Sequence, residues 1–207
     1  MDPDKAVKMA AEVDPDLAAR LRFIYEIDRL KSVLRRNLLS DASRNENSAE
    51  HSWHLAMVAM AMAPHAAEPV DIERVIRILL VHDIVEVDAG DVDIYDVEAR
   101  KAKEVEEVEA ADRIFGLLPE PEASELRSLW DEYEARATPE ARFAYACDRL
   151  QPLMLNLGTG GATWHARGVT SSQVKAINGA LADGLAGVWP VAERLIDESV
   201  ADGSLDP

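Results

Sequence analysis

The sequence has little of what several large protein classes require. Cys147 is its one cysteine, so no internal disulfide can form, and we expect a reducing, cytoplasmic setting. Aromatic residues make up 5% of the chain, and alanine is abundant, which favours close helix packing over a β-sandwich. There is no run of about 18 apolar residues, so we expect no membrane-spanning helix. The acidic first residues also lack the apolar core of a signal peptide.

Basic residues are scarce relative to acidic ones. The 22 lysines and arginines stand against 39 aspartates and glutamates, for a net charge of −17. A nucleic-acid polymer needs a broad basic footprint, so we expect no such partner. The charge balance still allows a small phosphorylated molecule to bind in a local basic pocket.

What the sequence does have is helical periodicity along nearly its whole length. Apolar residues recur at steps of three and four, and Asp14 followed by Pro15 has the composition of a helix start. We predict an all-α fold of about seven helices and no sheet. The helical segments expected are 15–35, 48–63, 71–85, 97–116, 121–135 and 139–156, followed by 171–185 and 188–201.

The segments between these helices indicate one domain without an internal linker. Residues 37–47, 86–95 and 157–172 are polar or glycine-rich and are expected to be loops. We predict a single domain over 1–207, with its core at about 15–156 and a C-terminal helical extension at about 157–207. The charged run from Lys101 to Glu109 is typical of a solvated helix face.

Four titratable residues fall inside apolar helical stretches: His51, His82, Asp83 and Asp148. Burying a carboxylate without a partner is costly, so buried aspartates are usually paired or bound to a metal. Two imidazoles and two carboxylates form a mixed nitrogen and oxygen set that suits a divalent ion such as Mn, Fe, Co, Ni or Zn. Composition and periodicity alone do not join the four into one site, since a single buried histidine is more often a core residue.

Three stretches carry a family resemblance. They are RNENSAEHSWHLAMVAMAMA, LLVHDIVEVDAGD and FAYACDRLQPLMLN. Their order resembles the HD-domain metal-dependent phosphohydrolase superfamily, and most closely its 5′-deoxynucleotidase branch, over roughly residues 20–156. In that branch R-x-E-N/S-x-x-x-H precedes H-D-x-x-E-x-x-x-x-D, and the last metal aspartate follows in a later helix.

The resemblance implies a role for each matching residue. It implies metal ligation by His51, His82, Asp83 and Asp148, for one divalent ion that could also be Mg. Glu86 would do general acid/base work near the metal-bound water, and Asp91 would bind a sugar hydroxyl or assist the leaving group. Arg44, and also Arg36, would bind substrate phosphate.

Two further expectations concern the surroundings of these residues. Arg35 and Arg36 could equally be a solvated pair at a helix end. Glu46 and Glu50 are candidate partners for the imidazole of His51.

The function implied by the resemblance is removal of phosphate from a small phosphate monoester by attack of metal-bound water. The preferred substrate class it implies is a (deoxy)nucleoside 5′-monophosphate. One alternative is a nucleoside triphosphate hydrolase that releases triphosphate or pyrophosphate. It would need several cations near the motif, and the sequence has few there. Another is a metal-stabilised nucleotide-binding module without catalysis. The resemblance also implies a homodimer.

Overall fold

The structure is a computed structural model that describes residues 3–207. Its helices and strands are α1 (Pro3–Ala11), α2 (Pro15–Asp28), η1 (Arg29–Ser32), β1 (Leu34–Leu38), β2 (Asn45–Asn47), α3 (Ser48–Met62), η2 (Ala63–His65), α4 (Ile72–Val81), α5 (Glu86–Ala89), α6 (Val97–Phe115), α7 (Glu122–Ala135), α8 (Pro139–Gly158), α9 (Ala162–Arg167), α10 (Ser171–Asn178), α11 (Leu181–Gly184) and α12 (Trp189–Ala201). The fold is all-α, as predicted, apart from the short pair β1–β2.

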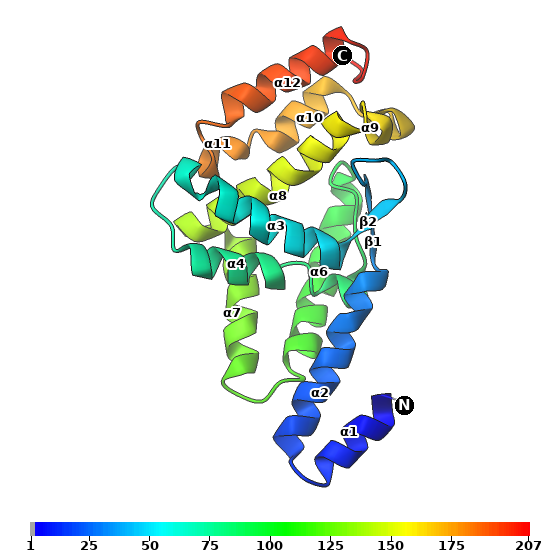
Figure 1. The fold of residues 1–207 in the computed structure, drawn as a ribbon, viewed down its shortest axis with the longest axis vertical. Helices are drawn as coiled ribbons and strands as arrows, with labels where there is room; N and C mark the ends of the chain where they lie inside the picture. The colour runs from blue at the N-terminus through cyan, green and yellow to red at the C-terminus, as the bar shows by residue number, and fades with distance from the viewer. Residues whose placement is uncertain (1–2) are drawn as a thin grey trace.

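Helix α8 lies at the centre of the molecule and carries much of the core. Helices α3 and α4 cross it, α7 packs near its start, and α10 and α11 pack against it from the C-terminal part (Figure 1). Its residues Phe143, Ala144, Ala146 and Cys147 are at most 1% exposed. The main core is continuous from α2 to the residues after α12, so the C-terminal part shares it.

Helices α1 and α2 form a hairpin that projects from the body (Figure 1). Asp14 caps α2, as the sequence indicated, because its side chain accepts a hydrogen bond from the Asp16 N–H. The helix ends at Asp28 and a 3₁₀ turn follows, so the predicted helix over 15–35 is too long. Helix α1 lies in a segment for which no element was predicted.

The prediction of no sheet is wrong over residues 34–47. Strands β1 and β2 pair antiparallel with an irregular register between Leu34↔Asn47 and Leu38↔Asn45. The Asn45 side-chain amide also donates to the Arg35 carbonyl oxygen at 2.8 Å. The strands are short, and polar residues occupy most of their positions, so they carry no alternating apolar signal.

The two other predicted loops also contain helix. Residues 86–89 form the single turn α5, and α9 lies inside the glycine-rich segment 157–172, after α8 has continued to Gly158. The predicted helix over 171–185 is split into α10 and α11. In the part of the chain that is described, no helix has both the length and the apolar character needed to cross a membrane.

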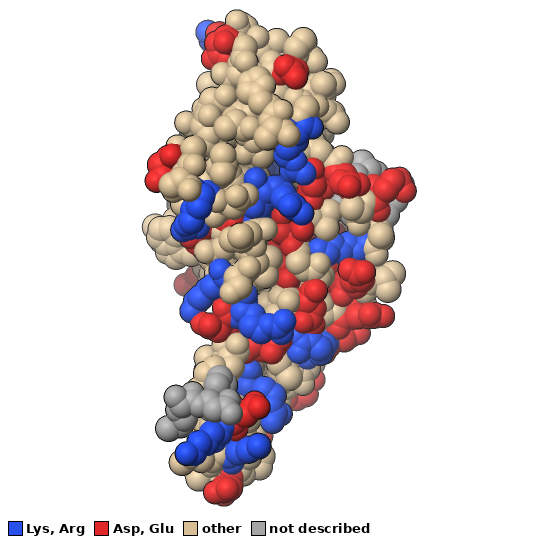
Figure 2. All heavy atoms as spheres, turned by 90° about the vertical axis from the view of Figure 1, so that its right-hand side faces the viewer, with Lys and Arg blue, Asp and Glu red and all other residues tan. Residues whose placement is uncertain are grey.

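Charged side chains of both signs gather over the middle of one face of the molecule (Figure 2). The upper part of the same face, towards the C-terminus, shows few of them. On this face the charged groups are therefore unevenly distributed, and basic groups are interleaved with acidic ones in its central region.

Candidate metal and substrate site

His51 lies in the first turn of α3 and is fully buried. Asn47 and Glu50 form a capping box at the start of this helix, which fixes where α3 begins. The His51 Nδ1 lies 3.1 Å from Gln151 Oε1 and 3.2 Å from Glu46 Oε2. Its Nε2 lies 3.0 Å from Asp148 Oδ1. The outer ring nitrogen is thus held by α8 and β2, and Nε2 faces the candidate metal site.

His82 and Asp83 follow the last turn of α4. The His82 Nδ1 donates to the Leu79 carbonyl oxygen at 2.8 Å, so its Nε2 carries the lone pair. This Nε2 is buried and has no hydrogen-bond partner among the described residues, although Asp83 Oδ1 lies 3.0 Å away and Asp148 Oδ1 4.0 Å away. These acceptor atoms face one another without a donor between them. A bound cation would relieve the repulsion between their lone pairs.

Asp148 lies in the middle of α8. Its Oδ2 accepts a hydrogen bond from the Tyr133 hydroxyl at 2.8 Å and forms an ion pair with Arg149. Its Oδ1 is therefore left to face His51. Burial works to raise the pKa of Asp148, but Arg149 and His51 outweigh it and hold that pKa well below its usual value. Asp148 is therefore anionic at neutral pH, the form that a candidate metal ligand requires.

The four predicted ligands converge, and they fit a divalent ion. One ligand atom from each of His51, His82 and Asp83 lies within 4.8 Å of the others, and Asp148 Oδ1 lies within 4.0 Å of both histidine Nε2 atoms. Two buried imidazoles and two carboxylates are a suitable donor set for a borderline divalent cation.

The two histidines differ in protonation. Burial and the positive charge of Arg35 lower the pKa of His51, but the hydrogen bond with Asp148 and the nearby carboxylate of Glu46 outweigh them and raise it to about 9. Burial lowers the pKa of His82 to about 4 against the attraction of Asp148. His82 is therefore neutral at pH 7, which is the form that binds a metal.

Glu86 begins α5 and reaches the same cavity. Its carboxylate accepts a hydrogen bond from the Ser48 hydroxyl at 2.5 Å. Burial, and then the negative charge of Asp83, raise the pKa of Glu86 to about 8. Burial also raises the pKa of Asp83, to about 6, against the attraction of Arg35. Glu86 thus holds a proton at neutral pH beside the candidate ligands.

Arg35 is the central residue that sequence reasoning missed. It is 9% exposed, and its Nη1 lies 2.9 Å from Asp83 Oδ2 and 3.8 Å from Asp91 Oδ1. Its Nε lies 3.5 Å from Glu46 Oε2. The alternative of a solvated pair is wrong for Arg35, which is buried on β1, whereas Arg36 is exposed and lines the same cavity. Most residues of β1 are polar, so the strand has no alternating apolar pattern that could have marked Arg35 in the sequence.

The remaining predicted residues divide between the cavity and the surface. Asp91 and Arg36 line the cavity. Arg44 is exposed and gives both guanidinium nitrogens to Glu50, at 2.5 and 2.8 Å, so the structure does not bring it to the site. Glu50 consequently caps α3 and binds Arg44 instead of contacting His51, whereas Glu46 contacts His51 as expected.

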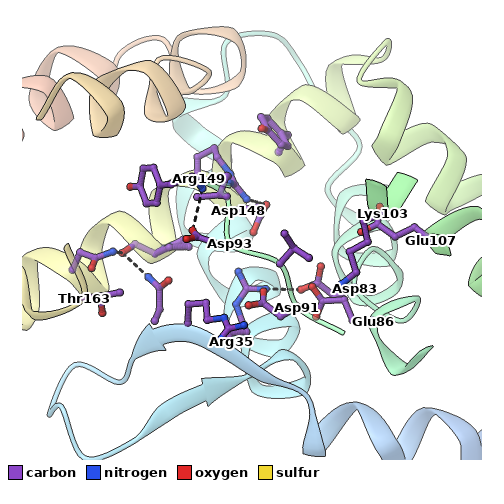
Figure 3. Close-up of a pocket in the computed structure, with 18 of the residues that line it drawn as sticks. Arg35, Asp83, Glu86, Asp91, Asp93, Lys103, Glu107, Asp148, Arg149 and Thr163 are labelled. Atoms are coloured by element: carbon purple, nitrogen blue, oxygen red, sulfur yellow. Dashed lines mark hydrogen bonds and ion pairs between the residues drawn. The ribbon is translucent and has the colours of Figure 1, made fainter. Parts of the chain in front are cut away.

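The cavity has a volume of about 330 Å³, in the size range of small-ligand sites (Figure 3). Lys103 and Glu107 of α6 lie on one side of it, so the prediction that the run 101–109 is only a solvated face is wrong for these two residues. Thr163 and Trp164 of α9 line another part.

More cationic side chains line the cavity than the sequence suggested. They are Arg35, Arg36, Lys103, Arg136, Arg149 and Arg167. Arg149 lies over the Tyr145 ring, 5.0 Å from its centroid, and Arg167 pairs with Asp93. These residues are distant from the HD motif in the chain, which is why counting cations near the motif underestimated them.

Comparisons with known proteins identify the family of this chain. The profile of the HD domain family matches residues 27–189. The chain is 32% identical to the 5′-deoxynucleotidase HDDC2 of Mus musculus over 138 residues, which is 66% of this chain and 68% of that protein. It is 31% identical to the human protein of the same name over 135 residues, 65% of each chain. The alignments thus span about two thirds of these relatives.

Solved structures show the same fold. A protein from Magnetospirillum magnetotacticum MS-1, described as a predicted metal-dependent phosphohydrolase, superposes with a TM-score of 0.88 and 50% identity, covering 94% of this chain and all of that one. The PH0347 protein of Pyrococcus horikoshii OT3 superposes with a TM-score of 0.62 at 19% identity, over 84% of this chain and 99% of its own. The chain belongs to the HD domain family.

Proposed function

We propose that this protein is a metal-dependent phosphohydrolase that removes phosphate from a deoxynucleoside 5′-monophosphate. The observation that carries the proposal is the cluster of His51, His82, Asp83 and Asp148 beside a cavity that Glu86 also lines. The names of the similar proteins HDDC2 support the choice of a nucleotide monoester.

The four predicted ligands would hold one divalent ion at the cavity. When bound, such an ion would polarise a phosphoryl oxygen and lower the pKa of water. This donor set accepts several ions, so Mn, Co, Fe, Ni, Zn and Mg are all candidates.

The surrounding side chains supply proton transfer and charge. Glu86 can donate its proton to the ester oxygen that leaves, because it holds that proton at neutral pH. Arg35 balances the carboxylates of Asp83 and Asp91, and so keeps two negative groups close together. Arg36 lines the cavity, which supports our assignment of it to a substrate phosphate.

The rest of the cavity suits a leaving group of nucleoside size. Tyr95 and Trp164 supply aromatic surface, and Asp91 supplies an acceptor for a sugar hydroxyl. Our proposal assigns this part of the cavity to the nucleoside.

The test is phosphate release from ribo- and deoxynucleoside monophosphates, without metal and then with each candidate ion. Asp83→Ala and Asp148→Ala are expected to lose at least about 100-fold in activity while keeping the circular dichroism of the wild type. The control is Asp131→Ala, at an exposed position on α7. Retained activity in both ligand variants would refute the proposal.

The arginines of the cavity make a triphosphate substrate the second candidate. Arg36, Arg136, Arg149 and Arg167 come from four different parts of the fold and line one space. Product analysis separates the two candidates, because a monophosphatase releases phosphate and this alternative releases triphosphate or pyrophosphate. Nucleotide binding without turnover under any metal would instead indicate a non-catalytic module.

We also infer a cytoplasmic homodimer. The exposed apolar side chains Trp53, Met57 and Met60 follow one another on α3 at steps of four and three residues, which supports a contact between two copies. Cys147 is buried, and burial raises the pKa of its thiol to about 12, so it is an inert core residue. As the one cysteine of the sequence it can form no internal disulfide, which supports a reducing compartment. Light scattering tests the dimer, with Trp53→Asp expected to yield monomers.

A further inference from the structure

Lys103 is a buried cation on an otherwise solvated stretch of helix. Its neighbours Glu104, Val105 and Glu106 are exposed, whereas Lys103 is 6% exposed. Burying an ammonium group is unfavourable unless nearby groups compensate it. The chain keeps this lysine beside the candidate site, so its contacts indicate what it does there.

The ammonium group of Lys103 donates a hydrogen bond to the carbonyl oxygen of Gly90. Gly90 ends α5 with φ 73° and ψ 171°, a conformation that is essentially restricted to glycine. Its own N–H donates to the Glu86 carbonyl oxygen at 2.8 Å. The corner of the chain between Glu86 and Asp91 is thus held at two points, once by α5 and once by α6.

The residue that follows this corner is Asp91. Its Oδ1 lies 3.8 Å from Arg35 Nη1, and the same nitrogen lies 2.9 Å from Asp83 Oδ2. Lys103 also attracts the Asp91 carboxylate. The close-up shows Lys103, Asp83, Glu86 and Asp91 in one part of the cavity (Figure 3). A shift of Gly90 would therefore move Asp91 relative to Arg35.

We propose that Lys103 is a positioning residue, which holds the Gly90 carbonyl so that Asp91 keeps its place in the cavity. This inference rests on the proposed function, because it assigns Lys103 to the same site. It extends that function by giving α6, outside the three stretches that carry the resemblance, a part in the alignment of the site.

The test is a double-mutant cycle between Lys103 and Asp91. Lys103→Met keeps the length and apolar stem of the side chain but removes the donor. We expect it to lower kcat/KM about 10-fold or more, because small displacements of a site residue are costly. In an Asp91→Asn background the same change is expected to cost less than about 2-fold, since a residue that acts through Asp91 has nothing left to position.

Two further variants sharpen the cycle. Lys103→Arg keeps a cationic donor and is expected to recover most of the activity. Lys31→Met is the matched control, because the Lys31 side chain is 68% exposed. Equal losses from Lys103→Met in both backgrounds would overturn the proposal, and so would wild-type activity in Lys103→Met.

A second readout does not depend on turnover. Amide hydrogen exchange over residues 88–93 is expected to be at least about 5-fold faster in Lys103→Met than in the wild type, with the rest of the protein unchanged. Unchanged exchange there would overturn the proposal even if activity fell. If the wild type hydrolysed no monophosphate, the proposed function would fail, and local exchange would still decide whether Lys103 holds this corner. Should Lys103→Met not fold, Lys103→Gln serves the same comparison.

Discussion

At the scale of single residues, the side chains behind the candidate ligands decide how well the site is formed. Asp148 presents Oδ1 to the site because Tyr133 and Arg149 occupy Oδ2. Such outer partners fix the orientation of a ligand and adjust its charge. Their contribution can be measured without changing any ligand.

Tyr133→Phe is expected to weaken metal binding. The substitution removes the hydroxyl that donates to Asp148 Oδ2 and leaves the buried ring in place. Loss of an outer partner typically costs about 10–100-fold in metal affinity. Calorimetric titration of metal-free protein measures the change. Tyr25→Phe, at an exposed tyrosine on α2, is the control and should bind like the wild type.

A second prediction at this scale concerns Glu107. Burial and the neighbouring Glu134 raise its pKa to about 7 against the attraction of Lys103. Between pH 4.5 and 7 the folded state keeps a proton that the unfolded state releases, so this residue makes the free energy of unfolding fall as pH rises through that window.

Glu107→Gln removes the titrating carboxyl group. The free energy of unfolding of this variant should therefore fall less steeply as pH rises. The quantity compared is the free energy of unfolding of the variant minus that of the wild type. We expect this difference to be on the order of 1 kcal/mol more favourable to the variant at pH 8 than at pH 4.5, after allowing for the partial exposure of Glu107. Urea unfolding at both pH values, on metal-free protein, measures this. Glu106→Gln, on the exposed side of α6, is the control, and its pH profile should parallel that of the wild type because Glu107 is intact. A parallel pH profile for Glu107→Gln and wild type would contradict the prediction.

At the scale of elements, close contacts with α8 place the C-terminal helices. Gly184 of α11 sits against this helix so closely that an added Cβ would lie 2.4 Å from the Arg142 carbonyl oxygen and 2.7 Å from the Ala146 Cβ. Both are firm parts of α8, so neither can yield cheaply. Glycine is required here by a close approach of two helices.

Gly184→Ala should therefore destabilise the protein. Overpacking of this kind costs about 1–3 kcal/mol, because the helices must separate. Gly187→Ala is the matched control, since nothing lies within 4 Å of the position that its Cβ would take. Thermal unfolding of the two variants is the measurement, and equal melting temperatures would show that α11 is loosely held.

Strand β1 places two adjacent arginines in different environments. Arg35 and Arg36 are neighbours in sequence, yet one is buried against Asp83 and the other is exposed. A helix would have set them about 100° apart, whereas a strand turns them to opposite faces. The assignment of this segment to a helix end and a loop therefore concealed the role of Arg35.

At the scale of the whole molecule, the C-terminal helices belong to the core. Val174, Leu181, Leu185 and Ile196 are fully buried in the cluster that also contains residues of α3, α4 and α8. Burying each such side chain contributes about 1.5–3 kcal/mol. The four contributions together are as large as the net free energy of unfolding of a typical protein, which is about 5–15 kcal/mol.

A chain ending at Gly168 is accordingly expected not to fold cooperatively, although it keeps every candidate site residue. Circular dichroism with thermal unfolding tests this. Removal of residues 1–13 is the control, because α1 packs with α2 in a separate small cluster around Val7, Ala10 and Ala18. The shortened control should retain the fold, and a cooperative transition in the chain ending at Gly168 would contradict the prediction.

Most helices and the four candidate ligands could be predicted from the sequence, because both depend on local pattern. Period, caps and breakers lie within a few residues of each helix, and His51, His82, Asp83 and Asp148 are recognisable as polar residues inside apolar runs. The resemblance then joined them, and the structure brings them together.

The residues that surround these candidate ligands depend on how distant parts of the chain pack together. Arg35, Lys103, Tyr133 and Arg149 reach the site from four different elements, and no local pattern distinguishes them from the other arginines, lysines and tyrosines of the chain. Arg44, by contrast, matches the family pattern but is bound by Glu50 at the surface. Local residue patterns were enough to predict most helices and the types of the candidate ligands. The packing of distant elements around α8 decided which charges are buried together, because a burial environment is created only when the chain folds.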